Sequence, residues 1–207
     1  DVCSSDLALN KDNGCRKSFI PRNDEFIELD IGAYHPTLLG LLVGYDFGND
    51  DIHKSFAKMY GVDYHKSKEL TFKQLYGGVF EQFKDLEFFQ RVQIYVDDLW
   101  QKFNEKGWIE CPVSKHVYRK DKLEDMKPQK LLNYVLQNLE TAMNVRILWD
   151  IFKSLRNRKT ELVLYTYDSF LFDFKEGEED LISEIKQIIK KYKLQIKESY
   201  GSDYDFR

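Results

Sequence analysis

Two aspartates stand where apolar, strand-like segments end, far apart in the sequence. Asp30 closes the segment EFIELDI at 25–31, and Asp168 lies between ELVLYTY at 161–167 and SFLFDF at 169–174. Carboxylates that converge without a cation repel each other and raise each other's pKa, so a convergent pair favours a divalent metal ion. If the two strands are neighbours, the pair predicts half of a phosphoryl- or nucleotidyl-transfer site with two Mg²⁺ ions. The alternative is that each aspartate is an ordinary turn residue.

A basic and aromatic stripe could supply the other half of such a site. Lys68, Phe72 and Tyr76 recur every four residues in KSKELTFKQLYGG, so they fall on one face of a helix. A lysine for phosphate, a phenylalanine for the sugar and a tyrosine for a base would together make a nucleotide-binding helix. The alternatives are core packing for the stripe and a solvated helical face for the lysine-rich stretch 53–73 around it.

The elements that must position these residues alternate between helices and strands, which predicts an α+β fold. Asp168 is predicted at the tip of a hairpin whose two arms are buried. Helices are expected over 34–45, 51–61, 63–78, 86–107, 128–156 and 178–193, and strands over 25–31, 107–113, 115–119, 161–167, 169–174 and 194–200.

The composition limits the class of protein. A chain of 207 residues with 43% hydrophobic residues forms one large domain or two small ones with a real core. No apolar run is long enough to span a bilayer, and a net charge of -4 does not by itself indicate a nucleic-acid binder. Three scattered cysteines without metal-ligand spacing predict reduced thiols in a cytoplasmic compartment.

The first seven residues, DVCSSDL, have neither an initiating Met nor a signal-peptide pattern. They match the translation of a common sequencing adapter, so we expect residues 1–7 to be an assembly artefact on a metagenomic fragment. The natural chain is then expected to continue upstream. The alternative is an authentic polar N-terminus.

Six segments, in order, resemble the family A (Pol I-like) DNA polymerases, and particularly their phage-type members. The resemblance runs from about residue 17 to the end of the chain. FIPRNDEFIELDIGAYHPTLLGLLVG resembles motif A, DIHKSFAKMYGV the D-I-H segment, KSKELTFKQLYGG motif B, GWIECPV the G-Y-V-E-T hairpin, NYVLQNLET the N-x-x-x-Q helix and YDS motif C.

The resemblance implies an antiparallel palm sheet with packed helices and a helical fingers subdomain. It implies palm segments at 8–46 and 128–207, and fingers with a small hairpin at 47–127. The implied activity is template-directed DNA synthesis from dNTPs on primer–template DNA, with two Mg²⁺ ions and no membrane. If the protein is phage-encoded, this happens in the cytoplasm of a bacterial host. The thumb and first palm strands would lie upstream, so we expect little activity from this piece alone.

The resemblance also implies roles for individual residues. Asp30, Asp168 and the backbone carbonyl of Ile31 would bind the metal ions, and Lys68 would bind the triphosphate and is a candidate general acid. The remaining implied contacts are with the nucleotide and the template–primer: His53 with the triphosphate, Phe72 with the deoxyribose, Tyr76 with the templating base, and Asn133 and Gln137 with the minor groove.

The chain departs from the family pattern at several of these positions. His35 stands where many members have a glutamate that screens out the ribose 2′-OH, and Tyr64 replaces an arginine. In motif C, Tyr167 replaces the histidine and Ser169 the glutamate. Asp173 is not expected to substitute, because five residues along a strand put it on the opposite face from Asp168. Two alternatives therefore stay open: a non-catalytic nucleic-acid-binding palm remnant, and a structural domain whose two turn aspartates lie far apart.

Overall fold

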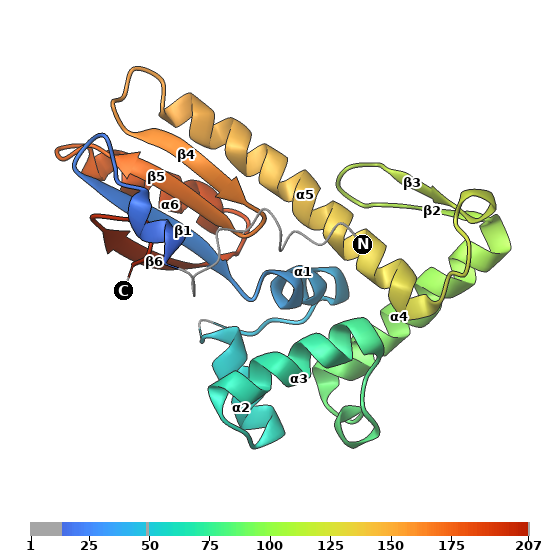
Figure 1. The fold of residues 1–207 in the computed structure, drawn as a ribbon. Coiled ribbons are helices and arrows are strands. Elements are labelled where there is room, and N and C mark those ends of the chain that lie inside the picture. The colour runs from blue at the N-terminus through green and yellow to red at the C-terminus, as the bar shows by residue number, and fades with distance from the viewer. Residues whose placement is uncertain (1–13, 49, 207) are drawn as a thin grey trace. The chain divides into compact units, whose positions relative to one another are not determined.

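The structure is a computed structural model that describes residues 14–48 and 50–206, so the predicted artefact at 1–7 lies outside the described residues. The chain packs as two compact units (Figure 1). The sheet unit comprises residues up to Gly32 together with those from Ile147 onward, and the helical unit is Ala33–Arg146.

The sheet unit is built on four antiparallel strands in the order β4-β5-β1-β6. These are β1 (Glu25–Gly32), β4 (Glu161–Thr166), β5 (Ser169–Phe174) and β6 (Gln195–Gly201). Helix α6 (Glu179–Lys190) contacts β6, and a short 3-10 turn, Cys15–Ser18, precedes β1 (Figure 1). The predicted α+β class with an antiparallel sheet is confirmed.

The burial pattern explains why β1 and β5 lie inside the sheet. In β1 the alternate residues Ile27, Leu29 and Ile31 are buried, while every residue of β5 is buried. Alternation suits a strand with one covered face, and a continuous apolar run suits a strand covered on both faces. The predicted hairpin is present, since β4 and β5 are joined by the two-residue turn Tyr167–Asp168.

The helical unit contains α1 (Tyr34–Val43), α2 (Ile52–Tyr60), α3 (Tyr64–Gly77) and α4 (Glu87–Lys106). It also contains the first part of α5 (Pro128–Ser154), the hairpin β2 (Trp108–Glu110) and β3 (Val117–Arg119), and 3-10 turns at Glu81–Phe83 and Lys120–Lys122. None of the helices that the structure describes is long and apolar enough to cross a membrane.

Aspartates cap the N-termini of α2 and α3. The side chain of Asp51 accepts a hydrogen bond from the Lys54 amide, and that of Asp63 accepts one from the Lys66 amide. Each bond satisfies an amide that the first turn of a helix leaves without an intrahelical partner. The predicted starts of α2 and α3 are therefore confirmed.

An aromatic core packs α2 against α4, and α2 in turn contacts α3. The Phe56 ring stacks on Tyr60 at 5.5 Å and meets Phe88 edge-on at 5.3 Å. The Tyr60 hydroxyl then bonds the Thr71 hydroxyl of α3 at 3.2 Å, and both residues are buried. Burial raises the pKa of Tyr60, so this hydroxyl stays neutral in its apolar surroundings.

Asp173 has a structural role. Its position in the sequence argues against a role as a metal ligand. Its buried carboxylate accepts the backbone N–H groups of Arg22 and Asn23 at 3.0 and 2.9 Å and so fastens the segment before β1 to β5. A hydrogen bond to a charged group contributes about 1.5–3 kcal/mol.

We therefore expect Asp173→Ala to lower the free energy of unfolding by about 2–4 kcal/mol, measured by urea denaturation. Asp173→Asn, which keeps one acceptor oxygen, should lose about half as much. The control is Asp85→Ala at an exposed loop position. An Asp173→Ala protein as stable as the control would contradict the anchoring role.

Candidate functional site

Of the two predicted metal-binding aspartates, Asp30 lies in β1 and Asp168 lies in the turn just before the neighbouring strand β5. Asp30 pairs with Ser169 in the β1–β5 ladder, and the Ile31 N–H donates to the Asp168 carbonyl at 2.7 Å. Asp30 is half-buried and Asp168 is exposed at the turn. The condition set by the sequence, that the two strands be neighbours, is met.

The backbone of Ile31 adds an oxygen at the same end of the sheet. In an antiparallel ladder, the N–H and C=O of one residue point to the same side, so the Ile31 carbonyl faces the turn that carries Asp168. Two carboxylates and a carbonyl are hard oxygen donors, as Mg²⁺ prefers. The donors fit the ion, although no cluster of three or more His, Cys, Asp or Glu able to hold a metal occurs within 14–48 and 50–206.

A further acid, Glu28, lies on the same face of β1 as Asp30, two residues away. The Ser169 hydroxyl donates to its Oε1 at 2.9 Å. Ser169 stands where the resembled family has a glutamate, and its side chain reaches an acid on the neighbouring strand instead. Sequence reasoning missed Glu28, although the period-2 alternation of β1 would have placed it beside Asp30.

In the helical unit, the two aromatic rings of the predicted α3 stripe are exposed, while Lys68 is half-buried. Phe72 and Tyr76 stack at 6.0 Å with an interplanar angle of 11°, and they are 42% and 38% exposed. The buried residues of α3 are instead Ser67, Thr71, Gln74 and Leu75. Exposed, stacked rings offer their free faces to a ligand, so the core-packing alternative for this stripe is wrong.

His53 of α2 joins this group. Its ring lies 6.2 Å from Phe72 and 6.0 Å from Tyr64, and the Ser67 hydroxyl donates to its backbone carbonyl at 2.9 Å. The side chain is buried, at 4% exposure of the residue, and its Nδ1 has no hydrogen-bond partner among the described residues. Burial, and then the charge of Lys68, lower the pKa of His53 to about 4.

The neighbour of Lys68 is the aromatic ring of Tyr64. The Lys68 Nζ stands 4.8 Å from the centre of the Tyr64 ring. Tyr64 occupies the position where the resembled family has an arginine, so the second positive charge is replaced by a ring face that attracts the ammonium group.

At the Tyr76 end of the stripe lies Glu140, a carboxylate that the sequence analysis did not single out, and it contacts Tyr76 through His35. His35 Nδ1 lies 2.5 Å from the Tyr76 hydroxyl and its Nε2 lies 2.9 Å from Glu140 Oε2, with His35 and Glu140 almost buried. A carboxylate only accepts, so Nε2 carries the hydrogen, and in a neutral imidazole Nδ1 then accepts from Tyr76. Burial and the Glu140 charge raise the pKa of Tyr76 to about 12.

The predicted template–primer residues of α5 lie one helical turn apart. Asn133 is half-buried, with an Oδ1 that accepts no hydrogen bond from the part of the chain described, and Gln137 is exposed. The structure thus groups His53, Lys68, Phe72, Tyr76 and His35 within the helical unit. It groups Asp30, Ile31 and Asp168 within the sheet unit.

No family model matches the chain, and no curated protein matches it. Among solved structures it resembles the POL domain of Pol1 from M. smegmatis, in complex with DNA primer-template and dNTP, with a TM-score of 0.72 and 15% identity. The match covers 92% of this chain and 42% of that chain, so this chain spans less than half of the neighbour. The likeness shows the fold, which is similar to the palm and fingers of a Pol I-like polymerase domain.

The burial of His53 predicts a titration well below the ordinary value of about 6.5. We expect the imidazole proton resonances of His53 to titrate near pH 4 in the folded protein and near 6.5 in urea. Between these values the unfolded chain binds more protons, so the free energy of unfolding should fall as the pH drops from about 6.5 to 4. His53→Gln should remove that part of the pH dependence. A folded-state titration at or above pH 6.5 would refute the assignment.

The Glu140 contact predicts one tautomer for His35. Nitrogen-15 correlation spectra should show the Nε2–H form in the wild type and a mixture of forms in Glu140→Ala, with a stability loss of about 1.5–3 kcal/mol. Glu140→Gln should keep the Nε2–H form, because its amide oxygen still accepts. Glu105→Ala, at an exposed glutamate of α4, is the control. A single Nε2–H form in Glu140→Ala would show that Glu140 does not fix the ring.

Proposed function

We propose that this chain is the palm and fingers part of a template-directed DNA polymerase of family A, phage type. The proposed reaction adds dNMP to a primer 3′-OH and releases pyrophosphate. The observation that carries the proposal is that, in a polymerase-like fold, Asp30 lies in β1 and Asp168 lies in the turn that leads into the neighbouring strand β5. The exposed Phe72 and Tyr76 rings of α3 support it.

Asp30, Asp168 and the Ile31 carbonyl would hold two Mg²⁺ ions. Bound there, such ions lower the pKa of the primer hydroxyl and neutralise the charge on the leaving pyrophosphate. The protein's own part is to keep the two carboxylates in fixed positions. The β1–β5 ladder does so through the backbone bond from Ile31 to Asp168.

Lys68 and His53 are proposed to meet the triphosphate. Lys68 supplies a full positive charge on a long side chain and is the candidate general acid for the pyrophosphate oxygen. His53 is neutral at physiological pH because of its burial, so it contributes a hydrogen bond. An arriving polyphosphate would favour its protonation, since a nearby negative charge raises a histidine pKa.

The remaining residues are proposed to bind the sugar, the base and the duplex. Phe72 would pack on the deoxyribose, Tyr76 would lie at the templating base and His35 would border the sugar. Asn133 and Gln137 would approach the minor groove of the template–primer. Closure of the 63–76 helix over a correctly shaped pair would couple selection to chemistry.

The proposed subdomains are palm segments at 8–46 and 128–207 and fingers at 47–127. The proposed partners are primer–template DNA and dNTPs, and the proposed location is the cytoplasm, of a bacterial host if the protein is phage-encoded. Because the chain spans 42% of its structural neighbour, the activity is proposed for a protein that includes the remaining parts.

A second candidate is a palm that binds nucleic acid without catalysis. It is favoured by Ser169, whose hydroxyl bonds Glu28 in place of a motif C carboxylate, and by Tyr64 in place of a cation. This candidate predicts DNA binding without Mg²⁺-dependent incorporation of nucleotides. The polymerase proposal predicts both.

The test is primer extension on a primed single-stranded template with Mg²⁺ and dNTPs, using this chain and the longest product of its gene. Asp30→Asn and Asp168→Asn should each lower the extension rate by about a thousandfold or more, since metal ions contribute several kcal/mol to the transition state. DNA affinity should stay nearly unchanged. Asp85→Asn, at an exposed loop position, is the matched control.

Near-normal extension by either aspartate variant would refute the metal assignment. Absence of extension by every protein form, with DNA binding intact, would favour the non-catalytic candidate.

A further inference from the structure

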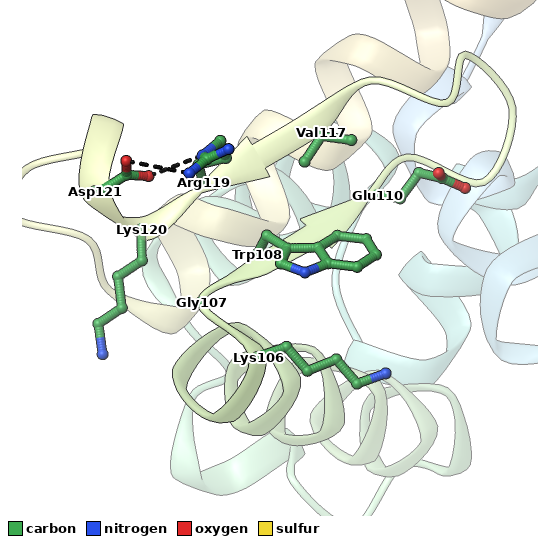
Figure 2. A pocket seen from close by; sticks show the side chains of 8 residues that line it. All are labelled: Lys106, Gly107, Trp108, Glu110, Val117, Arg119, Lys120 and Asp121. Atoms are coloured by element: carbon green, nitrogen blue, oxygen red, sulfur yellow. Dashed lines mark hydrogen bonds and ion pairs between the residues drawn. The ribbon is translucent and has the colours of Figure 1, made fainter.

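The outer face of the β2–β3 hairpin is hollowed at a place that shares no residue with the proposed polymerase site. The hollow has a volume of about 780 Å³ and lies over the end of α4 and both hairpin strands (Figure 2). Ile109 and Tyr118, in the middle of the two strands, are buried, so their neighbours project outward. Trp108 is 46% exposed, and Val117 is exposed next to it in the lining.

The two carboxylates in this hollow are already neutralised. Arg119 Nε donates to Asp121 Oδ1 at 3.0 Å, and Glu110 forms an ion pair with Lys115 at 3.1 Å. A paired carboxylate repels an approaching anion far less than a free one does. The acidic members of the lining therefore do not cancel its lysines.

Two lysines remain without a carboxylate. The Lys106 side chain makes no ion pair or hydrogen bond within the described residues, and Lys120 Nζ donates to the side-chain oxygen of Asn104 at 2.7 Å. Lys106 extends beside the Trp108 indole (Figure 2). Residues 106–122 carry five basic and two acidic side chains, although the whole chain has a net charge of -4. The hairpin is thus a local positive patch with an exposed indole at its centre.

We infer that this face of the hairpin binds single-stranded nucleic acid. A base would stack on Trp108, and backbone phosphates would lie against Lys106 and Lys120. Exposed bases are needed for such stacking, so a duplex should bind more weakly. The inference rests on the proposed function, for which a single-stranded template is the substrate, and adds a contact for that strand outside the site residues.

The test measures binding of a fluorescein-labelled oligo-dT of about a dozen nucleotides by anisotropy, with neither Mg²⁺ nor dNTP present. Trp108→Ala should weaken binding about fivefold or more, because stacking contributes roughly 1–3 kcal/mol per base. Trp108→Phe should restore most of the affinity, since it keeps a ring face. Trp149→Ala removes another exposed tryptophan, 63% exposed on α5, and serves as the control.

The salt dependence tests the lysines separately. Replacing Lys106 and Lys120 together by alanine should lower the slope of log K against log salt by about 1.4, about 0.7 for each lost phosphate contact on a single strand. Lys102→Ala, at a lysine of α4 paired with Asp98, should leave the slope unchanged. Comparing the affinities for oligo-U and oligo-dT shows whether the hairpin binds RNA or DNA more tightly.

The inference is overturned if Trp108→Ala binds as the wild type does, if the lysine variant keeps the full slope, or if a duplex binds as tightly as the single strand. If the protein extends primers but Trp108→Ala does not change oligonucleotide binding, this inference is overturned and the polymerase proposal stands. Oligonucleotide binding that depends on Trp108, with no extension, would overturn the polymerase proposal alone.

Discussion

The hydrogen bond from the Ile31 amide to the Asp168 carbonyl, 2.7 Å long, sets the geometry of the sheet unit's candidate site. It continues the β1–β5 ladder past Asp30 and Ser169 into the turn. A turn aspartate is otherwise free to adopt several conformations, and ordering one residue costs about 1–2 kcal/mol of backbone entropy. In this chain the burial of the hairpin arms offsets that entropy cost, because β5 is buried along its whole length.

The helical unit uses a different constraint, which acts through side chains. The Phe72 and Tyr76 rings of α3 are exposed, so core packing does not hold them in place. Their position depends on contacts at the two ends: His53 beside Phe72 near one end, and His35 with Glu140 at Tyr76 near the other. An exposed surface that a few contacts hold at its two ends can be both ordered and able to move.

Much of this was predictable from the sequence, and the reason is local. The starts of α2 and α3 at Asp51 and Asp63, and the hairpin turn at Asp168, follow from capping and turn chemistry within a few residues. Glu140 was not predictable in this way. Its partner His35 is 105 residues away, and nothing in the helix pattern of α5 distinguishes this glutamate from a solvated one.

The departures from the family pattern have a common physical form: each lost charge is met by a nearby group of another kind. Tyr64 presents a ring to Lys68, Ser169 donates to Glu28, and His35 lies between Tyr76 and the carboxylate of Glu140. Removing a single charge from a partly buried polar site leaves its partners unsatisfied, at a cost of about 1–3 kcal/mol. In each case the group that meets the changed residue comes from another part of the fold or from the same helix, so these polar groups remain satisfied.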